Sequence, residues 1–154
     1  MSMKVLGIRM SNSDFTFSVL GGTKEKPQLL VSKTLPLPSD YSPQDKFNWL
    51  FLEVKKVIRE EKIMGVVIKG AESMVRRSNS LDFRVGLEAI VYLAALKCSV
   101  KNITKKVKST IAKDLGLKGK AKYLSTKLNT ELIDNFNNKS SKIQEAALAA
   151  WTIL

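Results

Sequence analysis

The sequence contains no histidine and only one cysteine, Cys98. Without histidine, this chain alone cannot build a Ser-His-Asp or Cys-His catalytic site or an imidazole-bound metal centre. One thiol can form neither an internal disulfide nor a multi-cysteine zinc site, so we expect a reducing, cytoplasmic location. Any metal would need oxygen ligands, chiefly from the 14 aspartates and glutamates. The sequence therefore leaves magnesium-type chemistry or no metal chemistry.

Long hydrophobic runs are also missing. No apolar run approaches the roughly 20 residues that span a bilayer, and residues 1–7 lack the apolar stretch of a cleavable signal peptide. Hydrophobic residues make up 44% of the 154 residues and charged residues 26%, which is typical of a folded soluble protein. We therefore expect a single domain over residues 1–154, with its own core, no cofactor and no membrane partner.

Negative charge is scarce, because 26 lysines and arginines outnumber 14 acids and give a net charge of +12. Such a charge attracts polyanions, of which nucleic acids are the commonest in a cytosol, although lysines can also serve only as a solvated surface. Between residues 101 and 127 lysines alternate with hydroxyl side chains that suit phosphate contacts. The sequence predicts a nucleic-acid-binding face that contains Arg76, Arg77, Lys101, Lys105, Lys106, Lys108, Lys113, Lys118, Lys120 and Lys122.

The hydrophobic pattern predicts a strand-rich first third and a helical remainder. Strands are predicted at residues 4–9, 14–20, 28–35, 64–68 and 99–103. Helices are predicted at residues 43–62, with Ser42 as N-cap and Pro43 in the first turn, and then at 81–97, 104–114, 120–134 and 142–154. An antiparallel meander followed by strand–helix–strand units predicts an α/β fold. We expect a mixed five-stranded sheet with helices on both faces, the RNase H-like arrangement.

Five segments, in order along nearly the whole chain, carry a family resemblance: Val5–Ile8, Val66–Lys69, Val85–Ala89, Val107–Ile111 and Gln144–Ala150. They resemble the first strand, the fourth strand, the next helix, the basic segment after the fifth strand and the closing helix of RuvC-type Holliday-junction resolvases. The resemblance implies an RNase H-like fold, a DNA or RNA partner and self-association as a homodimer. The VVIK strand and the Gln-Glu-Ala-Ala of the last helix also resemble an uncharacterised bacterial family, the domain of unknown function numbered 3010.

The resemblance also implies where a nuclease site would lie. RuvC-like nucleases hold two magnesium ions about 4 Å apart with acids at the end of the first strand, after the fourth strand and on the last helix. The matching positions here are Arg9, Lys69, Lys142 and Glu145, which leaves one acid. Cations there would repel metal ions by several kcal/mol at low dielectric. We therefore expect a degenerate active site with no catalytic residue, in which Glu145 pairs with Arg9, Lys69 or both.

Two alternatives stay open. Asp14 and Glu72 lie close in sequence to the lost acidic positions and could rebuild a metal site, which would make the protein a magnesium-dependent nuclease; solvated acids are the simpler interpretation. The chain could instead be an interaction scaffold for an acidic protein. The sequence does not distinguish DNA from RNA, or a junction from a duplex or a single strand.

Overall fold

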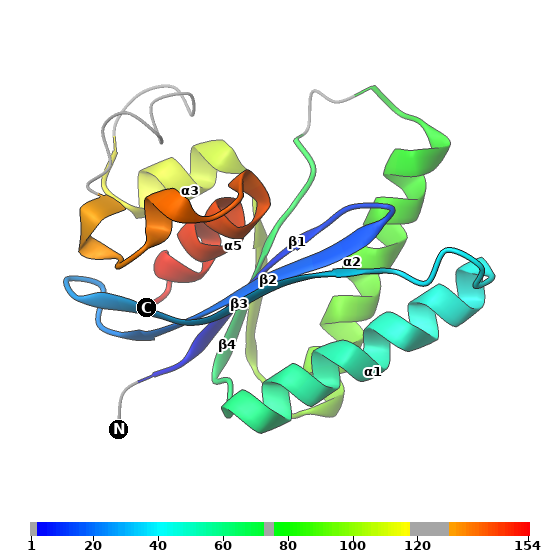
Figure 1. The fold of residues 1–154 in the computed structure, drawn as a ribbon, viewed down its shortest axis with the longest axis horizontal. Coiled ribbons are helices and arrows are strands. Elements are labelled where there is room, and N and C mark those ends of the chain that lie inside the picture. The colour runs from blue at the N-terminus through cyan, green and yellow to red at the C-terminus, as the bar shows by residue number, and fades with distance from the viewer. Residues whose placement is uncertain (1–2, 73–75, 118–129) are drawn as a thin grey trace.

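The computed structural model describes residues 3–72, 76–117 and 130–154, and these residues contain a mixed five-stranded sheet (Figure 1). The sheet order is β3-β2-β1-β4-β5, in which β1 to β3 form an antiparallel meander and β4 and β5 run parallel to β1. The strands are β1 (Val5–Met10), β2 (Asp14–Gly22), β3 (Pro27–Pro36), β4 (Gly65–Lys69) and β5 (Asn102–Lys106). The predicted fold class is confirmed.

Helices cover both faces of this sheet (Figure 1). One face carries α1 (Pro43–Glu61) and α2 (Asn79–Lys97), and the other carries α3 (Lys108–Asp114) and α5 (Ser141–Trp151). Between residues 130 and 140 the chain forms two short 3-10 helices, η2 (Thr130–Leu132) and η3 (Phe136–Asn138), which precede α5. Ser42 caps α1 as predicted, since its hydroxyl accepts a hydrogen bond from the Asp45 amide.

The sheet separates two apolar cores, which explains the near-continuous apolar runs of β1 and β4. Leu6, Ile8 and Ile68 pack in the core beneath α1 and α2, whereas Val5 and Val67 pack beneath α3 and α5. Neighbouring residues of a strand thus face opposite layers. On the α5 side, the small residues Ala147 and Ala150 allow the helix to lie close to the strands.

The prediction was wrong about where the fifth strand and the following helix begin. Residues 98–100 complete a turn after α2, in which the Val100 amide donates to the Ala95 carbonyl, so β5 starts only at Asn102. Thr104, the first residue of the predicted helix at 104–114, pairs instead with Val67 inside the sheet. Helix α3 begins at Lys108, and its N-cap residue, Val107, makes no side-chain capping bond.

Other boundaries differ by a few residues. The predicted helix at 120–134 lies largely outside the described residues, and its last part contains η2. Residues 135–141, between the last two predicted helices, contain η3, and the last helix ends at Trp151, three residues before the predicted end. Helix α2 begins two residues early, where the Ser78 hydroxyl accepts a hydrogen bond from the Leu81 amide.

Candidate functional site

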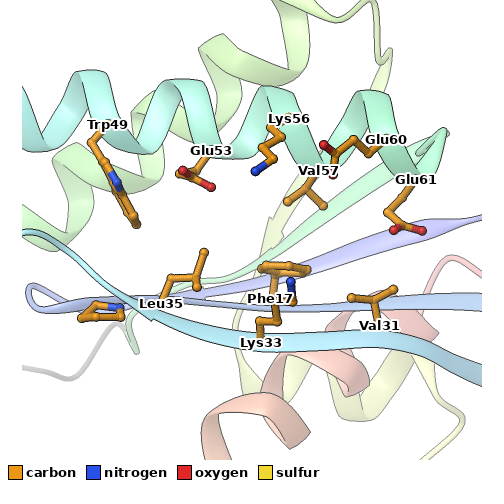
Figure 2. Close-up of a pocket in the computed structure, with 11 residues that line it drawn as sticks. Phe17, Val31, Lys33, Leu35, Trp49, Glu53, Lys56, Val57, Glu60 and Glu61 are labelled. Carbon is orange, nitrogen blue, oxygen red and sulfur yellow. The ribbon is translucent and has the colours of Figure 1, made fainter.

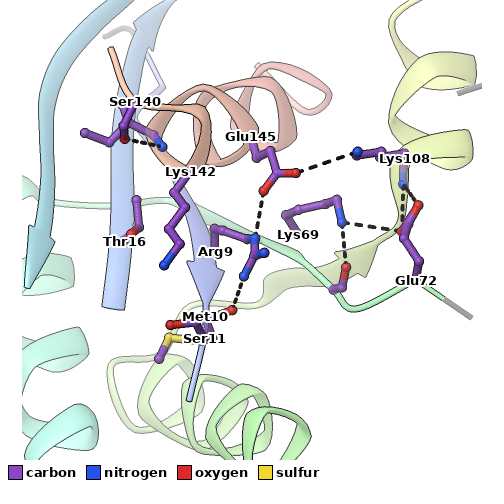
Figure 3. A network of polar contacts seen from close by, with 12 residues as sticks. Arg9, Met10, Ser11, Thr16, Lys69, Glu72, Lys108, Ser140, Lys142 and Glu145 are labelled. Atoms are coloured by element: carbon purple, nitrogen blue, oxygen red, sulfur yellow. Dashed lines mark hydrogen bonds and ion pairs between the residues drawn. The ribbon is translucent and has the colours of Figure 1, made fainter. Parts of the chain in front are cut away.

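Helix α5 lies directly against β1 and β2 because Gly7 has no side chain. A Cβ atom at Gly7 would overlap the backbone carbonyl of Ala146. The Ser18 hydroxyl also donates to the Ile143 carbonyl, at 3.0 Å. These contacts place Lys142 and Glu145, on the first turns of α5, beside the carboxyl end of β1, where the ion pairs described below form (Figure 3).

The predicted pairing of Glu145 with Arg9 is confirmed. The Arg9 Nε lies 2.7 Å from the Glu145 Oε2, and the two side chains are 19% and 25% exposed. A second guanidinium nitrogen of Arg9 donates to the Met10 carbonyl, which fixes the direction of the side chain. The other Glu145 oxygen lies 3.9 Å from the Lys108 Nζ (Figure 3).

Lys69, at the end of β4, binds a different carboxylate. Its ammonium donates to the Gly70 carbonyl at 2.8 Å and lies 3.4 Å from the Glu72 Oε2. The residue is only 3% exposed, and this burial lowers the pKa of Lys69 although the negative charges of Glu72 and Glu145 act in the opposite direction. The Glu72 carboxylate also accepts a hydrogen bond from the Lys108 backbone amide, with both of its oxygens 3.4 Å from the Lys108 nitrogen. Glu72 therefore connects the end of β4 to the start of α3.

Lys142 binds Asp14, which begins β2. The Lys142 Nζ lies 2.9 and 2.7 Å from the two Asp14 oxygens, and the Ser11 hydroxyl donates to one of them at 2.7 Å. Burial alone would raise the pKa of Asp14, but the hydrogen bonds from Lys142 and Ser11 and the positive charges of Lys142 and Arg9 outweigh it and lower the pKa. The interpretation of Asp14 as a solvated acid is wrong, since its side chain is 19% exposed and paired.

The sequence interpretation missed a second charged group on the α2 side of the sheet. Glu88 is 1% exposed and lies 3.2 Å from the Lys105 ammonium and 3.4 Å from the Arg84 Nε. The Arg84–Glu88 pair is within ion-pair distance but is not aligned as a hydrogen bond. Another Arg84 nitrogen donates to the Lys69 carbonyl, at 3.3 Å. The position of Glu88 inside the apolar stretch Val85–Ala95 was the one sign in the sequence that this carboxylate is buried and paired.

We call the residues of these contacts the ion-pair cluster. It contains the cations Arg9, Lys69, Arg84, Lys105, Lys108 and Lys142, and the acids Asp14, Glu72, Glu88 and Glu145. Each acid contacts at least one cation, and cations are in excess. Within the residues that the structure describes, no three His, Cys, Asp or Glu side chains are grouped so that they could hold a metal ion.

The predicted nucleic-acid-binding residues that the structure describes do not lie on one face of the protein. Lys105 and Lys106 are consecutive in β5, so Lys105 binds Glu88 on the α2 side, whereas Lys106 binds Asp114 on α3, at 2.7 Å. Lys101 precedes β5, at the opposite end of the strand. Arg76, Arg77 and Lys113 are exposed, whereas Lys118, Lys120 and Lys122 lie outside the described residues.

A pocket of about 360 Å³ lies between α1 and the edge of the sheet formed by β2 and β3 (Figure 2). Its apolar walls include Phe17, Leu35 and Trp49, and charged side chains of α1 and β3 surround its opening. It lies on the α1 side of the sheet and contains none of the residues of the ion-pair cluster. The pocket is therefore separate from the candidate site.

No family model and no curated protein matches this chain. The chain resembles solved structures: RuvC of Thermus thermophilus in complex with a Holliday junction substrate has a TM-score of 0.78 at 17% identity, over 97% of this chain and 91% of that one. A yeast mitochondrial Holliday junction resolvase has a TM-score of 0.61 at 16% identity, over 97% of this chain and 75% of that one. The fowlpox virus Holliday junction resolvase has a TM-score of 0.52 at 7% identity, over 97% of this chain and 94% of that one.

At such identities the likeness shows the fold, and the chain has the RuvC-like form of the RNase H-like fold. The predicted resemblance is thus confirmed at the level of fold, while the resemblance to the domain of unknown function numbered 3010 stays a prediction. In the described part of the chain, no helix combines the length and apolarity that a membrane span needs.

Proposed function

We propose that this protein binds nucleic acid at the carboxyl end of β1 and β4, and that it does not cut nucleic acid by a two-metal mechanism. The observation that carries the proposal is the excess of cations over acids in the ion-pair cluster, on a RuvC-like fold. In open α/β sheets, ligands bind beyond the carboxyl ends of the strands, where this cluster lies. A neighbour with this fold binds a Holliday junction, which makes branched DNA the first substrate to test.

Exposed cations of the ion-pair cluster and of the segments beside it supply the phosphate contacts. Lys108 and Lys142 keep 47% and 35% of their side-chain surface open to solvent, although each also touches a carboxylate. Arg76 is exposed in the segment that follows Glu72, and Lys113 is exposed on α3. Lysine and arginine contacts of this type position a phosphate backbone without reading its sequence.

The residues of the cluster do not fit a pair of magnesium ions. A two-metal site needs several carboxylates free to ligate, but here Asp14 is held by Lys142 and Glu145 by Arg9. A dication near Glu145 would also meet the Arg9 guanidinium and the buried Lys69 ammonium. The alternative of a relocated metal site is disfavoured, because both acids that would form it, Asp14 and Glu72, already bind lysines.

Binding should weaken steeply with salt, because each phosphate contact releases condensed counterions. On duplex DNA we expect the slope of log affinity against log salt to be about −0.9 per contact. The variant Arg76→Gln with Lys108→Gln should therefore make the slope about 1.8 less steep than that of the wild type. Fluorescence anisotropy on labelled junction, duplex and single-stranded DNA and RNA, measured from low to moderate salt, gives the slope for each form.

The matched control removes two charges elsewhere. Lys26 and Lys33 are exposed on the β2–β3 hairpin, away from the cluster, and Lys26→Gln with Lys33→Gln changes the net charge equally. We expect this variant to keep the wild-type slope. Equal effects of the two variants would mean that net charge alone attracts the nucleic acid, and no binding even at low salt would discard the proposal.

A further inference from the structure

The outer side of β3 is an open strand edge. This strand is the last of the sheet, and among the described residues it pairs only with β2. An edge strand presents unpaired backbone amides and carbonyls, which can form hydrogen bonds with another strand. Pro27 and Pro36 stand at its two ends, and Leu30 has no partner in β2 because the register shifts there. Residues 31–35 are therefore the regular part of the open edge.

A concave surface lies on each face of this edge. The pocket of about 360 Å³ beneath α1 takes Val31, Lys33 and Leu35 from β3 (Figure 2). A hollow of about 310 Å³ lies on the α5 side and takes residues 29–32 from β3. Its other wall consists of polar residues beside η3: Asp134, Asn135 and Lys139. Successive side chains of a strand point to opposite faces, so one added strand would fill the pocket and the hollow together.

The side chains of β3 decide what such a strand should carry. Val31, Lys33 and Leu35 face the α1 side, because their neighbours in β2 pack in the core beneath α1. Ser32 and Thr34 alternate with them and face the α5 side. Side chains of adjacent strands pair across the ladder, so Val31 and Leu35 favour apolar neighbours and Lys33 favours an acidic one. The other face favours hydroxyl side chains.

The distribution of charge also favours an acid beside Lys33. This residue is exposed, and no ion pair within the described part of the chain involves it. The acids that line the pocket, Glu53, Glu60 and Glu61, belong to α1, across the pocket from β3 (Figure 2). The net charge of +12 attracts an acidic segment at long range. An acid in the added strand would therefore meet an unpaired cation.

We propose that the open edge of β3 binds an extended peptide segment of another protein by strand addition. The segment carries an apolar, an acidic and an apolar side chain on the α1 face, and hydroxyl side chains on the other face. In this mode of binding, backbone hydrogen bonds supply affinity, and the cavities for alternate side chains supply specificity.

A second copy of this chain fits the open edge less well. The Val31 and Leu35 side chains that it would offer already pack against its own core, and two chains of charge +12 repel one another. The pocket and the hollow contain no residue of the ion-pair cluster. The proposal therefore stands or fails independently of nucleic-acid binding.

The probe is a fluorescently labelled peptide, Thr-Val-Thr-Glu-Thr-Val-Thr. Its side chains have the same order in both directions, so it fits a parallel or an antiparallel addition. Anisotropy with the full chain should show saturable binding. The control peptide Thr-Thr-Val-Val-Glu-Thr-Thr has the same composition without the alternation, and it should bind at least about 10-fold more weakly.

Two N-methylated forms of the probe test the backbone contact. One is methylated at the valine and glutamate amides and the other at the threonine amides between them. Alternate amides of a strand point to opposite edges, so one form should lose binding by at least about 10-fold and the other should keep it. Binding of the unmethylated probe should also slow hydrogen exchange at alternate amides of residues 31–35.

A charge exchange tests the predicted contact of Lys33. Lys33→Glu should weaken binding of the probe by about 5- to 10-fold, and a probe with lysine in place of its glutamate should restore it. Lys26→Glu is the matched control, because Lys26 is exposed and lies outside both the pocket and the hollow. This variant should bind the probe as the wild type does. A loss in Lys33→Glu without recovery would overturn the pairing with an acid.

Three results would overturn strand addition by a peptide. The first is the absence of saturable binding even at millimolar peptide, and the second is equal binding of the probe and the control peptide. The third is binding that tolerates both N-methylated forms. Slow exchange of the β3 amides that strengthens with protein concentration, without any peptide, would identify a second copy as the occupant and would also overturn the proposal.

Discussion

Gly7→Ala should destabilise the protein by about 3 kcal/mol or more, because the methyl group has no room. A Cβ at this position would overlap the Ala146 carbonyl and meet the Ala150 side chain, and both belong to α5. Backbone cannot rotate away as a side chain can, so α5 would have to move from the sheet. The displacement would also carry Glu145 away from Arg9. Urea unfolding followed by circular dichroism measures the loss.

Gly86→Ala is the matched control for this substitution. An added Cβ at Gly86 would lie 3.2 Å from the ring of Phe47, a partly buried side chain that can shift. The position is inside α2, where alanine is better than glycine by about 1 kcal/mol in helix propensity. We expect Gly86→Ala to change the free energy of unfolding by less than about 1 kcal/mol in either direction. If Gly7→Ala behaved like this control, α5 would not be held as closely as described.

Arg9→Met and Glu145→Gln should each lower the free energy of unfolding by about 2 kcal/mol. The double-mutant cycle should give a coupling energy of about 1 to 2 kcal/mol between the two side chains. The pair is partly buried, so its contribution should lie between that of an exposed pair, under about 1 kcal/mol, and that of a buried one, about 3 to 5 kcal/mol. The double mutant should be more stable than the sum of the single losses implies, because neither partner is left alone.

The Lys4–Glu61 pair provides the comparison for this cycle. Its atoms are 3.6 Å apart and the side chains are 37% and 28% exposed, so its cycle of Lys4→Met and Glu61→Gln should show a coupling below about 0.5 kcal/mol. Equilibrium unfolding at neutral pH measures both cycles. If the Arg9–Glu145 coupling were as small as this control, the site would hold eroded surface charges and not a structural ion pair.

The order of strands and helices was predictable because hydrophobic periodicity and capping residues act locally. Ser42 and Pro43 start α1 where the sequence indicated, and the apolar run of β4 lies in the centre of the sheet. The start of α3 was not predictable in this way. Lys106 stays in β5, where its ammonium contacts the Asp114 carboxylate and the Thr152 hydroxyl. Thr152 lies 46 residues further along the sequence. No local pattern reveals such a partner.

The candidate site was predictable only in part. The Arg9–Glu145 pair followed from the positions that the family resemblance assigns, but Lys142 was not expected to bind Asp14. The register of β1 and β2 decides this, because Arg9 lies opposite Thr16, and Asp14, two residues before Thr16 in β2, faces the same side. Both Asp14 and Arg9 thus face α5. The sequence interpretation missed Arg84 and Glu88, because a helical pattern does not show which charged side chains become buried. In the structure, Arg84 donates to the Lys69 carbonyl and Glu88 pairs with Lys105.

One experiment tests the central claim most directly: labelled branched and duplex DNA are incubated with the protein, with and without magnesium or manganese, and binding and cleavage are measured in the same reactions. The proposed function predicts a salt-sensitive complex and intact DNA under every condition, because the acids of the cluster are held by cations. Divalent-dependent products that disappear with Asp14→Asn or Glu72→Gln would contradict it and would identify a relocated metal site.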